Sequence, residues 1–463
     1  MGNNNTGFYG YSSESKMNSN AINRNVPKNR MPSSGKFKVS KILGIILCLL
    51  QLAASVAFVY YVKTVDFLDE KYFYGLIGIL SGLFILTYVM AHPKKMFVRR
   101  LGKFISIVVI IVLAVGSYMI WKSPLTVTGK KVSNKPFVVY LSAADTFGKF
   151  DKKTLSRTDT NIIAVVNPKT YTILMVSTPR DYYVPIEAKS VAPNSMEKLT
   201  HVSLFGSGVA YSQDKDPLSA AEWSIGGQQG VYWHPGNQAI MATLKKLYNI
   251  KVKNKDYYYA KVNFTGFESL VDELGGVDVK VEDNFSTKTY ATYKKVSPER
   301  KEYVYKKGTM KMDGSTALTF ARERHSFGDG DMARNRNQIR VMKAIADKMI
   351  SGKTLVNYNG VIDAINNCYA TDIDLSSMAK LQTQISTKSD YNGWKFMSFS
   401  VIGVPGKDKS TYTGNIHAVV YQNQDSVANA SKLIAKALAA KTQDDAKKLN
   451  KLVKKYTKAQ AGQ

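Results

Sequence analysis

Three long apolar runs near the start of the chain dominate its hydrophobic pattern. They extend from Ile42 to Val62, from Tyr72 to Ala91 and from Phe104 to Trp121, and none contains an acidic or basic residue. Each is close to the roughly 20 residues that a bilayer-spanning helix needs. A buried helix of a soluble protein is the alternative, but three successive runs favour membrane helices. The long polar segment before the first run indicates a retained anchor rather than a cleaved signal peptide.

The charges that flank these runs predict their orientation. The leading segment carries Arg24, Lys28, Arg30, Lys36, Lys38 and Lys41, and the second loop carries Lys94, Lys95, Arg99, Arg100 and Lys103. The first loop instead holds Asp66, Asp69 and Glu70. Because cytoplasmic loops are enriched in Lys and Arg, the leading segment and the second loop should be cytoplasmic. Everything after Trp121 should then lie outside the cytoplasm, anchored to the cell membrane, and no nucleic-acid partner is expected.

Beyond the membrane runs, short β-rich runs alternate with helical patterns. The predicted strands are Phe137 to Ser142, Asn161 to Val166, Thr172 to Ser177, Tyr257 to Val262 and Val277 to Val281. The predicted helices are Gln238 to Tyr248, Phe264 to Leu274 and Asp331 to Ile350. This alternation predicts an α/β fold, a layered α/β/α domain with a central mixed β-sheet.

The pattern divides the chain into five parts. Residues 1–40 should be a disordered cytoplasmic tail, 41–121 three transmembrane helices, 122–135 a juxtamembrane linker, 136–425 the outer domain and 426–463 a basic, solvated helical tail. Two polar segments, Gly206 to Gly236 with its tryptophans and Thr287 to Lys307, interrupt the rhythm. They are either surface excursions or the borders of a saccharide groove, because aromatic faces suit sugar rings.

Composition adds an expected partner and a compartment. The 463 residues carry a formal net charge of +29, which indicates an anionic partner such as a membrane surface or an acidic polymer. The chain has two cysteines, Cys48 in a membrane run and Cys368 in the outer domain, which cannot form a structural disulfide. An exported domain without disulfides favours a Gram-positive bacterium.

The segment from Phe320 to Arg340 concentrates five arginines around two aspartates, which suits a phosphate-rich ligand. Asp331 is a plausible N-cap of the helix that follows. Asp331, Arg334 and Gln338 stand at i, i+3 and i+7 and share one helix face, whereas Arg336 and Arg340 point elsewhere. A salt-bridged, solvated surface is the alternative.

The two arginines before this helix, Arg322 and Arg324, would converge on its start if Thr319 to Arg324 is extended. Further upstream, three polar residues lie at predicted strand ends. Asp145 follows the first strand, Asp159 precedes the second and Arg180 follows the third. The two carboxylates could hold a hard divalent cation beside phosphates, although isolated strand-end aspartates are commonly turn caps.

Several motifs in order give this region a family resemblance. They are Asp145, Arg157-Thr-Asp159, Asn167-Pro-Lys169, Ser177-Thr-Pro-Arg-Asp181, Lys198-Leu-Thr-His201, Phe264-Thr-Gly-Phe267, Leu274-Gly-Gly-Val277 and Arg322-Glu-Arg324 through Gln338. From about Phe137 to Ile350 the chain resembles the LytR-CpsA-Psr family, and its three-helix anchor is similar to that of the capsule-associated members. One departure is Ala143-Ala144, where the family commonly has Gly followed by a hydrophobic residue.

The resemblance implies a cell-envelope phosphotransferase. Such enzymes move teichoic acid, capsular or other wall polysaccharide from a polyprenyl-pyrophosphate carrier to peptidoglycan. It further implies that Arg180, Arg322, Arg324 and Arg334 grip the pyrophosphate, assisted by Lys198 and Gln338. Asp145 and Asp159 would bind magnesium, with manganese as the alternative ion, and Asp331 would be the base. The open alternatives are a polyprenyl-pyrophosphate hydrolase, a membrane-anchored transcriptional regulator and a non-catalytic wall-binding module.

Overall fold

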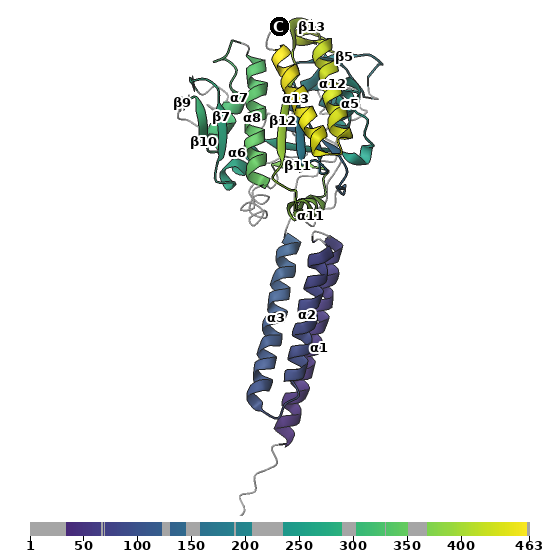
Figure 1. The fold of residues 1–463 in the computed structure, drawn as a ribbon, viewed down its shortest axis with the longest axis vertical. Coiled ribbons are helices and arrows are strands. Elements are labelled where there is room, and N and C mark those ends of the chain that lie inside the picture. The colour runs from purple at the N-terminus through teal and green to yellow at the C-terminus, as the bar shows by residue number, and fades with distance from the viewer. Residues whose placement is uncertain are drawn as a thin grey trace, which may run out of the picture.

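The computed structural model describes residues 34–65, 68, 70–122, 130–144, 158–188, 191–205, 235–288, 302–328, 330–350 and 368–460. Three long helices carry a layered domain at one end (Figure 1). They are α1 (Ser34–Val65), α2 (Glu70–Met90) and α3 (Met96–Lys122), and each is long and apolar enough to cross a membrane. The three predicted membrane helices are therefore confirmed, and α1 begins inside the segment that we predicted to be disordered.

Small and polar side chains bring the membrane helices together. A Cβ atom on Gly102 of α3 would stand 2.8 Å from the Cβ of Met90, so only glycine permits this approach. The Thr87 hydroxyl of α2 donates a hydrogen bond of 3.0 Å to Oε1 of the fully buried Gln51 in α1. Close approach and interhelical hydrogen bonds are the usual means of association in lipid, where apolar burial offers little.

A six-stranded mixed sheet forms the centre of the domain, in the order β11-β6-β1-β2-β3-β12. Its strands are β1 (Phe137–Ala144), β2 (Thr158–Asn167), β3 (Thr172–Thr178), β6 (Tyr257–Asn263), β11 (Tyr369–Thr371) and β12 (Lys395–Ser400). β1 is parallel to β6 and antiparallel to β2, while β3 is antiparallel to β2 and parallel to β12. The predicted strands in this region are all present.

Helices cover both faces of the sheet. Val138, Tyr140 and Ile163 point to one face, which is covered by α5 (Pro235–Leu247), α12 (Gln424–Ala439) and α13 (Gln443–Gln460). Phe137 and Val139 point to the other face, which is covered by α8 (Asp331–Ile350) and α11 (Leu375–Ser386). Alternate residues of each strand are thus buried on opposite sides, and the predicted α/β/α layers with a mixed sheet are confirmed.

A second core lies beside the sheet. It is formed by α6 (Phe264–Glu273), α7 (Gly314–Arg322), β7 (Val277–Val281), β8 (Phe285–Lys288), β9 (Glu302–Tyr305) and β10 (Gly308–Met312). Val341 and Ile345 of α8 are buried in this cluster, whereas Ile339 of the same helix is buried in the sheet cluster. The helix α8 therefore joins the two cores.

Close packing in this second core requires a glycine in each of two motifs, Phe264-Thr-Gly-Phe267 and Leu274-Gly-Gly-Val277. Asn263 caps α6 by accepting a hydrogen bond of 2.8 Å from the Gly266 amide, and a Cβ on Gly266 would stand 2.6 Å from the Cys368 carbonyl oxygen. Gly276 has φ +82° and lies against the Met312 carbonyl. Any larger residue would displace α6 or the β7–β10 pair.

The segment from residue 122 to residue 135 precedes β1, and its second half packs against the domain. Lys130 pairs with Asp372 at 2.6 Å, the Tyr258 hydroxyl donates to the Lys131 carbonyl, and the Val132 amide donates to Ser377 Oγ. The segment that we predicted as a linker up to residue 135 is thus packed against the sheet from Lys130 onward. Residues 123–129 lie outside the described part of the chain.

The C-terminal segment is helical, as predicted, but it is not a solvated tail. Leu433 and Ile434 of α12 and Leu449 and Val453 of α13 are buried in the main core. Cys48 and Cys368 are both buried, and they form no disulfide with each other.

Small elements extend the sheet edge at which β3 ends. They are β4 (Tyr183–Pro185), β5 (Met196–Lys198), α4 (Leu199–Val202), η2 (Ser203–Phe205) and the hairpin of β13 (Gly403–Lys409) and β14 (Ile416–Gln422). The short helix η3 (Asn254–Asp256) instead precedes β6 at the opposite edge. The fully buried Glu197 carboxylate ties several of them together. It accepts hydrogen bonds from His201 Nδ1 (3.0 Å), Ser410 Oγ (2.6 Å), the Tyr412 amide (2.8 Å) and the Lys198 amide (2.8 Å).

Burial alone would raise the pKa of Glu197, but these donors outweigh it and hold the pKa below its usual value. A carboxylate whose pKa is lowered on folding stabilises the fold above its unfolded pKa, and that contribution is lost as the pH falls through the folded pKa. We therefore expect Glu197→Ala to lower the free energy of unfolding by about 3 kcal/mol at neutral pH, because buried donors lose their acceptor. The measurement is chemical denaturation of the parent and the variant.

The matched control is Glu187→Ala, since Glu187 forms only a partly exposed pair with Lys246. Glu187→Ala should lower the free energy of unfolding by less than about 1 kcal/mol. The difference in free energy of unfolding between the parent and Glu197→Gln should become smaller as the pH falls below about 4. Equal losses for Glu197→Ala and Glu187→Ala would contradict the structural role of Glu197.

Candidate functional site

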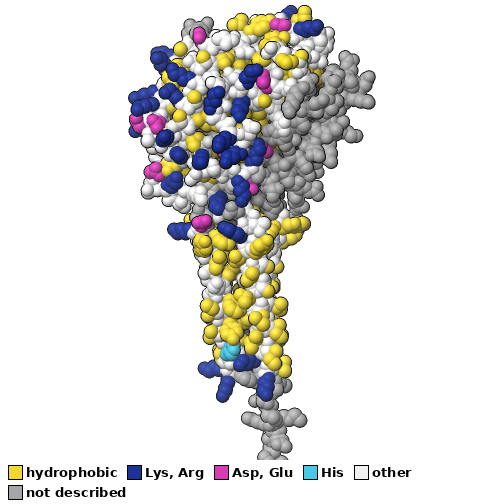
Figure 2. Space-filling model, turned by 90° about the vertical axis from the view of Figure 1, so that its right-hand side faces the viewer, with side chains coloured by type: hydrophobic (Ala, Val, Ile, Leu, Met, Phe, Trp, Pro, Cys, Tyr) yellow, Lys and Arg dark blue, Asp and Glu magenta, His cyan; other side chains and the backbone are white. Residues whose placement is uncertain are grey.

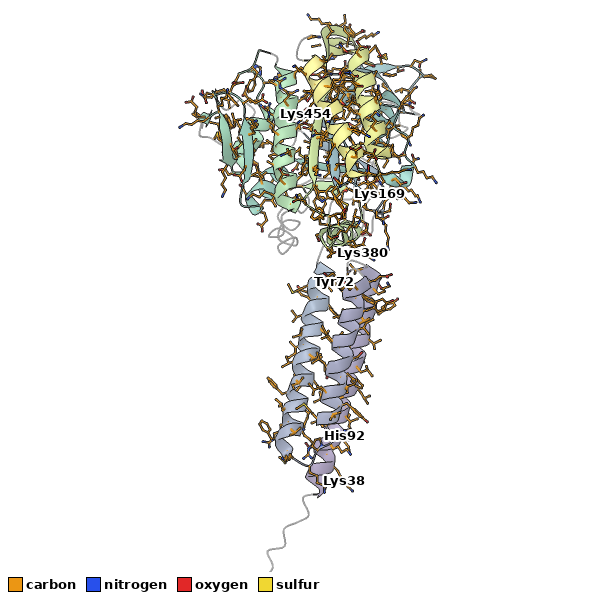
Figure 3. The ribbon with its side chains drawn as sticks, in the orientation of Figure 1. Lys38, Tyr72, His92, Lys169, Lys380 and Lys454 are labelled. Carbon is orange, nitrogen blue, oxygen red and sulfur yellow. The ribbon has the colours of Figure 1, made fainter. Side chains whose placement is uncertain are left out.

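Four strands end at one edge of the central sheet. β1, β6, β3 and β12 share a direction, so Ala144, Asn263, Thr178 and Ser400 mark the same edge, and the antiparallel β2 begins there at Thr158. Ligand sites of α/β sheets favour the edge at which the strands end. The polar residues that we selected at strand ends are therefore brought to one side of the domain. The opposite edge, which includes Lys169 in the β2–β3 turn, faces the membrane helices (Figure 3).

A β-bulge positions Asp159 at this edge. Ala143 is paired with Thr160 and Ala144 with Thr158, which leaves Asp159 as the extra residue of β2. Bulges re-aim side chains beside functional sites. The Asp159 carboxylate accepts a charge-assisted hydrogen bond from Arg180 Nη1, two residues after the end of β3. Two of the predicted site residues are thus in direct contact.

Arg180 and Lys198 both approach the carboxylate of Asp181. Its Nε is 3.6 Å from Asp181 Oδ2, and Lys198 Nζ is 3.5 Å from Asp181 Oδ1. The Arg180 carbonyl accepts a hydrogen bond of 2.8 Å from the Thr200 amide in α4. The side chains of Arg180 and Lys198 are 19% and 12% exposed, so both cations are largely withdrawn from water yet accessible. This arrangement suits an anion that replaces the carboxylates as a partner.

The first turns of α8 bring Arg334 and Gln338 to the same region. Asn337 of α8 donates a hydrogen bond to the Phe320 carbonyl in the last turn of α7, whose Arg322 lies over Phe264 at the end of β6. Lys343, further along α8, lies 6.0 Å from the ring of Phe396 near the start of β12, so the first turns of α8 lie toward the edge at which the strands end. Arg334 and Gln338 are 7% and 6% exposed. Within the described part of the chain, Oε1 of Gln338 has no hydrogen-bond partner. The two residues share a buried helix face, as their spacing predicts.

The remaining residues of α8 behave differently. Arg340 bonds Asn337 and pairs with Glu282, and Arg336 is partly exposed. Asp331 begins α8, but its side chain lies outside the described part of the structure, as does all of Asp145. Asp145 is covalently next to Ala144, the last residue of β1.

The condition under which Arg322 and Arg324 would lie on one side, an extended segment from Thr319 to Arg324, is not met. α7 continues to Arg322, because Asp313 caps it and Ala317, Leu318 and Phe320 are buried on its inner face. The Arg322 guanidinium lies 4.0 Å from the centre of the Phe264 ring, at the end of β6. Arg322 is thus held at the same edge by a cation–π contact, whereas Arg324 is exposed and contacts His325.

The residues described at the edge fit a magnesium ion only as part of a shared site. Among the described residues there is no group of three or more His, Cys, Asp or Glu that could hold a metal. Magnesium, however, is commonly bound by one or two carboxylates together with substrate phosphates and water. Asp159 supplies one such carboxylate beside the cationic cluster, and Asp145 would supply the second. The donor set is therefore compatible with magnesium when a phosphate is present.

Three residues near the edge were missed by the sequence analysis. Lys261 of β6 is 3% exposed, and burial lowers its pKa to about 7. Its signal was a lysine within an otherwise buried strand. Asp181 is the shared partner of Arg180 and Lys198, and Glu323, 1% exposed, accepts from the His325 and Ser326 amides and so fixes the chain after α7. The aromatic candidates in residues 206–234 lie outside the described part.

Arg180, Lys198, Arg322 and Arg334 thus place several cations at this edge. Arginine forks and a lysine there can bind several phosphate oxygens at once, and buried cations act more strongly on charge than exposed ones do. The edge is therefore suited to a ligand that carries phosphate groups.

The sequence of the chain is similar to those of several named proteins. A protein of Enterococcus faecalis named polyisoprenyl-teichoic acid–peptidoglycan teichoic acid transferase TagU is 26% identical over 305 residues, which cover 63% of this chain and 84% of that protein. The protein of the same name from Bacillus anthracis is 29% identical over 255 residues, which cover 55% of this chain and 66% of that protein. The crystal structure of B. subtilis TagV matches 66% of this chain and 99% of its own, with 20% identity and a TM-score of 0.45.

The match to a family model covers more of this chain than the matches to these three proteins do. It covers residues 121–455, which include the whole sheet, the helices on both of its faces and the cationic edge. The chain therefore belongs to the LytR_cpsA_psr family.

Proposed function

We propose that this protein transfers a glycopolymer from a polyprenyl-pyrophosphate carrier to a hydroxyl group of peptidoglycan, forming a phosphodiester. The observation that carries the proposal is the cluster of Arg180, Lys198, Arg322 and Arg334 at one sheet edge of a domain that is joined to membrane helices. The names of the relatives favour a teichoic acid as the polymer, and capsular polysaccharide is the other class to be tested.

The chemistry requires little covalent help from the protein. The acceptor hydroxyl attacks the phosphorus that carries the polymer, the bridging P–O bond of the diphosphate breaks, and polyprenyl phosphate leaves. Such transfers depend on fixed geometry and on positive charge around the phosphate oxygens. Arg180 and Lys198 are positioned by Asp159 and Asp181, Arg322 by Phe264, and Arg334 by the buried face of α8.

Three aspartates complete the proposed machinery. Asp331, at the start of α8, is the candidate base that would accept the proton of the attacking hydroxyl. Asp145 and Asp159 would hold magnesium, which supplies charge neutralisation on the diphosphate when bound. Arg324 is exposed and can reach a ligand only from the solvent side of the edge.

The membrane helices support an outer location of the domain. Lys38 and His92 lie at the end of the bundle that is remote from the domain, and Tyr72 lies at the near end (Figure 3). The cations of the α2–α3 loop share the remote end. By the positive-inside rule this end is cytoplasmic and the domain is external, where a tether to the bilayer raises the local concentration of a lipid-borne donor.

Replacement of Arg180 tests the transfer mechanism. We expect Arg180→Ala to lower polymer transfer by about 10²-fold to 10³-fold, because a preorganised donor to the diphosphate is removed. The assay combines full-length protein, lipid-linked polymer, magnesium and peptidoglycan, and measures polymer attached to peptidoglycan. Arg322→Ala should show a similar loss.

Arg340→Ala is the matched control, because Arg340 pairs with the exposed Glu282 and bonds Asn337. It should change transfer less than about threefold, and thermal melting should show that all variants fold. Full activity of both Arg180→Ala and Arg322→Ala would refute the site. Release of free polymer without attachment by the parent would identify a hydrolase instead.

Metal removal tests the magnesium assignment. Chelation with EDTA should abolish transfer and added magnesium should restore it, while a manganese arm shows whether that ion can substitute. Asp159→Asn should need about tenfold more magnesium for half-maximal transfer, since one carboxylate ligand is lost. Transfer that is insensitive to EDTA would contradict the proposed metal site.

Fusions at the C-terminus test the orientation. An alkaline phosphatase attached after Gln463 should be active in cells, because that enzyme needs export, whereas a fluorescent protein that folds only in the cytoplasm should stay dark. A bright cytoplasmic fusion with an inactive phosphatase would overturn the external location and revive a regulatory role.

A further inference from the structure

The outer face of α13 carries a row of lysines that the proposed transfer site does not use. Its members are Lys447, Lys448, Lys451, Lys454, Lys455 and Lys458, and all six are exposed. We refer to them as the α13 lysine face. The opposite face of the helix is buried through Ala446, Leu449 and Val453, so the lysines are fixed on a rigid support.

The spacing of these lysines forms a continuous stripe. Lys447, Lys451, Lys454 and Lys458 follow each other at intervals of four, three and four residues, which places them along one side of the helix. At a rise of 1.5 Å per residue the stripe is about 16 Å long. Lys448 and Lys455 lie beside it. The charges are thus arranged along a line rather than around a point.

Few acidic residues balance this line. The sequence contains no Asp or Glu after Asp445, and Asp444 pairs with Lys448 at 2.7 Å. The adjacent helix α12 adds the exposed Lys432 and Lys436. The neighbouring side of the domain also carries many Lys and Arg side chains and few acidic ones (Figure 2). Uncompensated charge of this kind attracts a polyanion.

The stripe leads toward the edge that holds Arg180. At its start, Gln443 donates to the Thr170 carbonyl in the turn between β2 and β3. At its end, Gln460 donates to Ser426 Oγ, which also accepts from the Ile402 amide. The Ile402 carbonyl in turn accepts from the hydroxyl of Tyr182, two residues after Arg180. α13 therefore spans the sheet from the edge that faces the membrane helices to the edge that holds Arg180.

The direction of the helix distinguishes between two anionic partners. In Figures 1 and 3, α13 runs roughly along the long axis of the molecule, as the membrane helices do, and Lys454 lies well away from them. A flat anionic bilayer could meet only one end of such a stripe. An extended polyanion can follow its whole length.

We propose that the α13 lysine face is a docking track for the anionic glycopolymer, a chain linked by phosphodiesters or bearing other regular negative charges. The inference rests on the proposed function, which supplies such a polymer at the neighbouring edge. The track holds the polymer beyond the transferred phosphate and aligns it with the site. Each contact is an exposed, salt-screened ion pair, so affinity comes from several contacts together.

The test is binding of a fluorescent poly(glycerol phosphate) to the full-length protein in nanodiscs of neutral lipid. The variant combines Lys447→Gln, Lys451→Gln, Lys454→Gln and Lys458→Gln. The matched control combines Lys280→Gln, Lys306→Gln, Lys307→Gln and Lys311→Gln, which remove the same charge from the exposed β7–β10 region. Melting temperatures should match the parent, because all eight side chains are exposed.

We expect the α13 variant to bind at least about tenfold more weakly, and the slope of log affinity against log salt to fall by about 2 to 3. The control should bind like the parent, and an uncharged dextran should not bind. Equal binding by variant and control would overturn the proposal. The proposal would also be overturned if the α13 variant bound the polymer like the parent but lost binding to phosphatidylglycerol vesicles. That result would assign the α13 lysine face to a membrane surface.

The binding assay contains no diphosphate, so its outcome is separate from that of transfer. Lysine-dependent polymer binding with no transfer activity would support the track and refute the proposed function. Normal transfer with polymer binding that ignores the four lysines would refute the track alone.

Discussion

The burial of cations at the edge of an apolar sheet is the constraint on which the site depends. A guanidinium withdrawn from water is costly unless a carboxylate or an anion compensates it. Arg180 meets this requirement through Asp159, which a β-bulge turns toward it, and through Asp181. The backbone of Arg180 also anchors α4, and Glu197 links α4 to the β13–β14 hairpin. Charge compensation at one residue is therefore coupled to the surrounding local structure.

The helix α8 gives this edge its second wall. Because Ile339 is buried against the sheet and Val341 in the adjacent core, the helix cannot rotate without disturbing both. Arg334 and Gln338 are consequently held in one phase, and Glu323 fixes the chain that leads into the helix. Preorganised donors of this kind need little rearrangement when a charged group arrives. The shared helix thus turns packing of two cores into geometry at the site.

Local patterns predicted the strands and the helix phase of α8, because β-branched runs and i, i+3, i+7 spacing are local properties. Long-range compensation could not be predicted in this way. The sequence left open whether Thr319 to Arg324 is extended or helical, and the Asp313 cap and the buried Ala317 and Leu318 make it helical as far as Arg322. The C-terminal region was interpreted as a solvated tail because its lysines dominate the composition and obscure the apolar spacing of Leu433, Ala437 and Leu449. Lys261 could be recognised as buried only once its strand was placed inside the sheet.

The two cationic surfaces differ in a way that suits different tasks. At the sheet edge the cations are largely buried and individually held, so they act strongly on a small group of defined geometry. On α13 the lysines are exposed, and each attracts an anion only weakly. Weak, repeated attraction aligns a long chain without fixing any one unit, whereas strong attraction along the whole chain would hold the product as tightly as the substrate and slow its release. Only interactions that strengthen in the transition state accelerate the reaction, so the strong charges belong at the edge and the weak ones along the track.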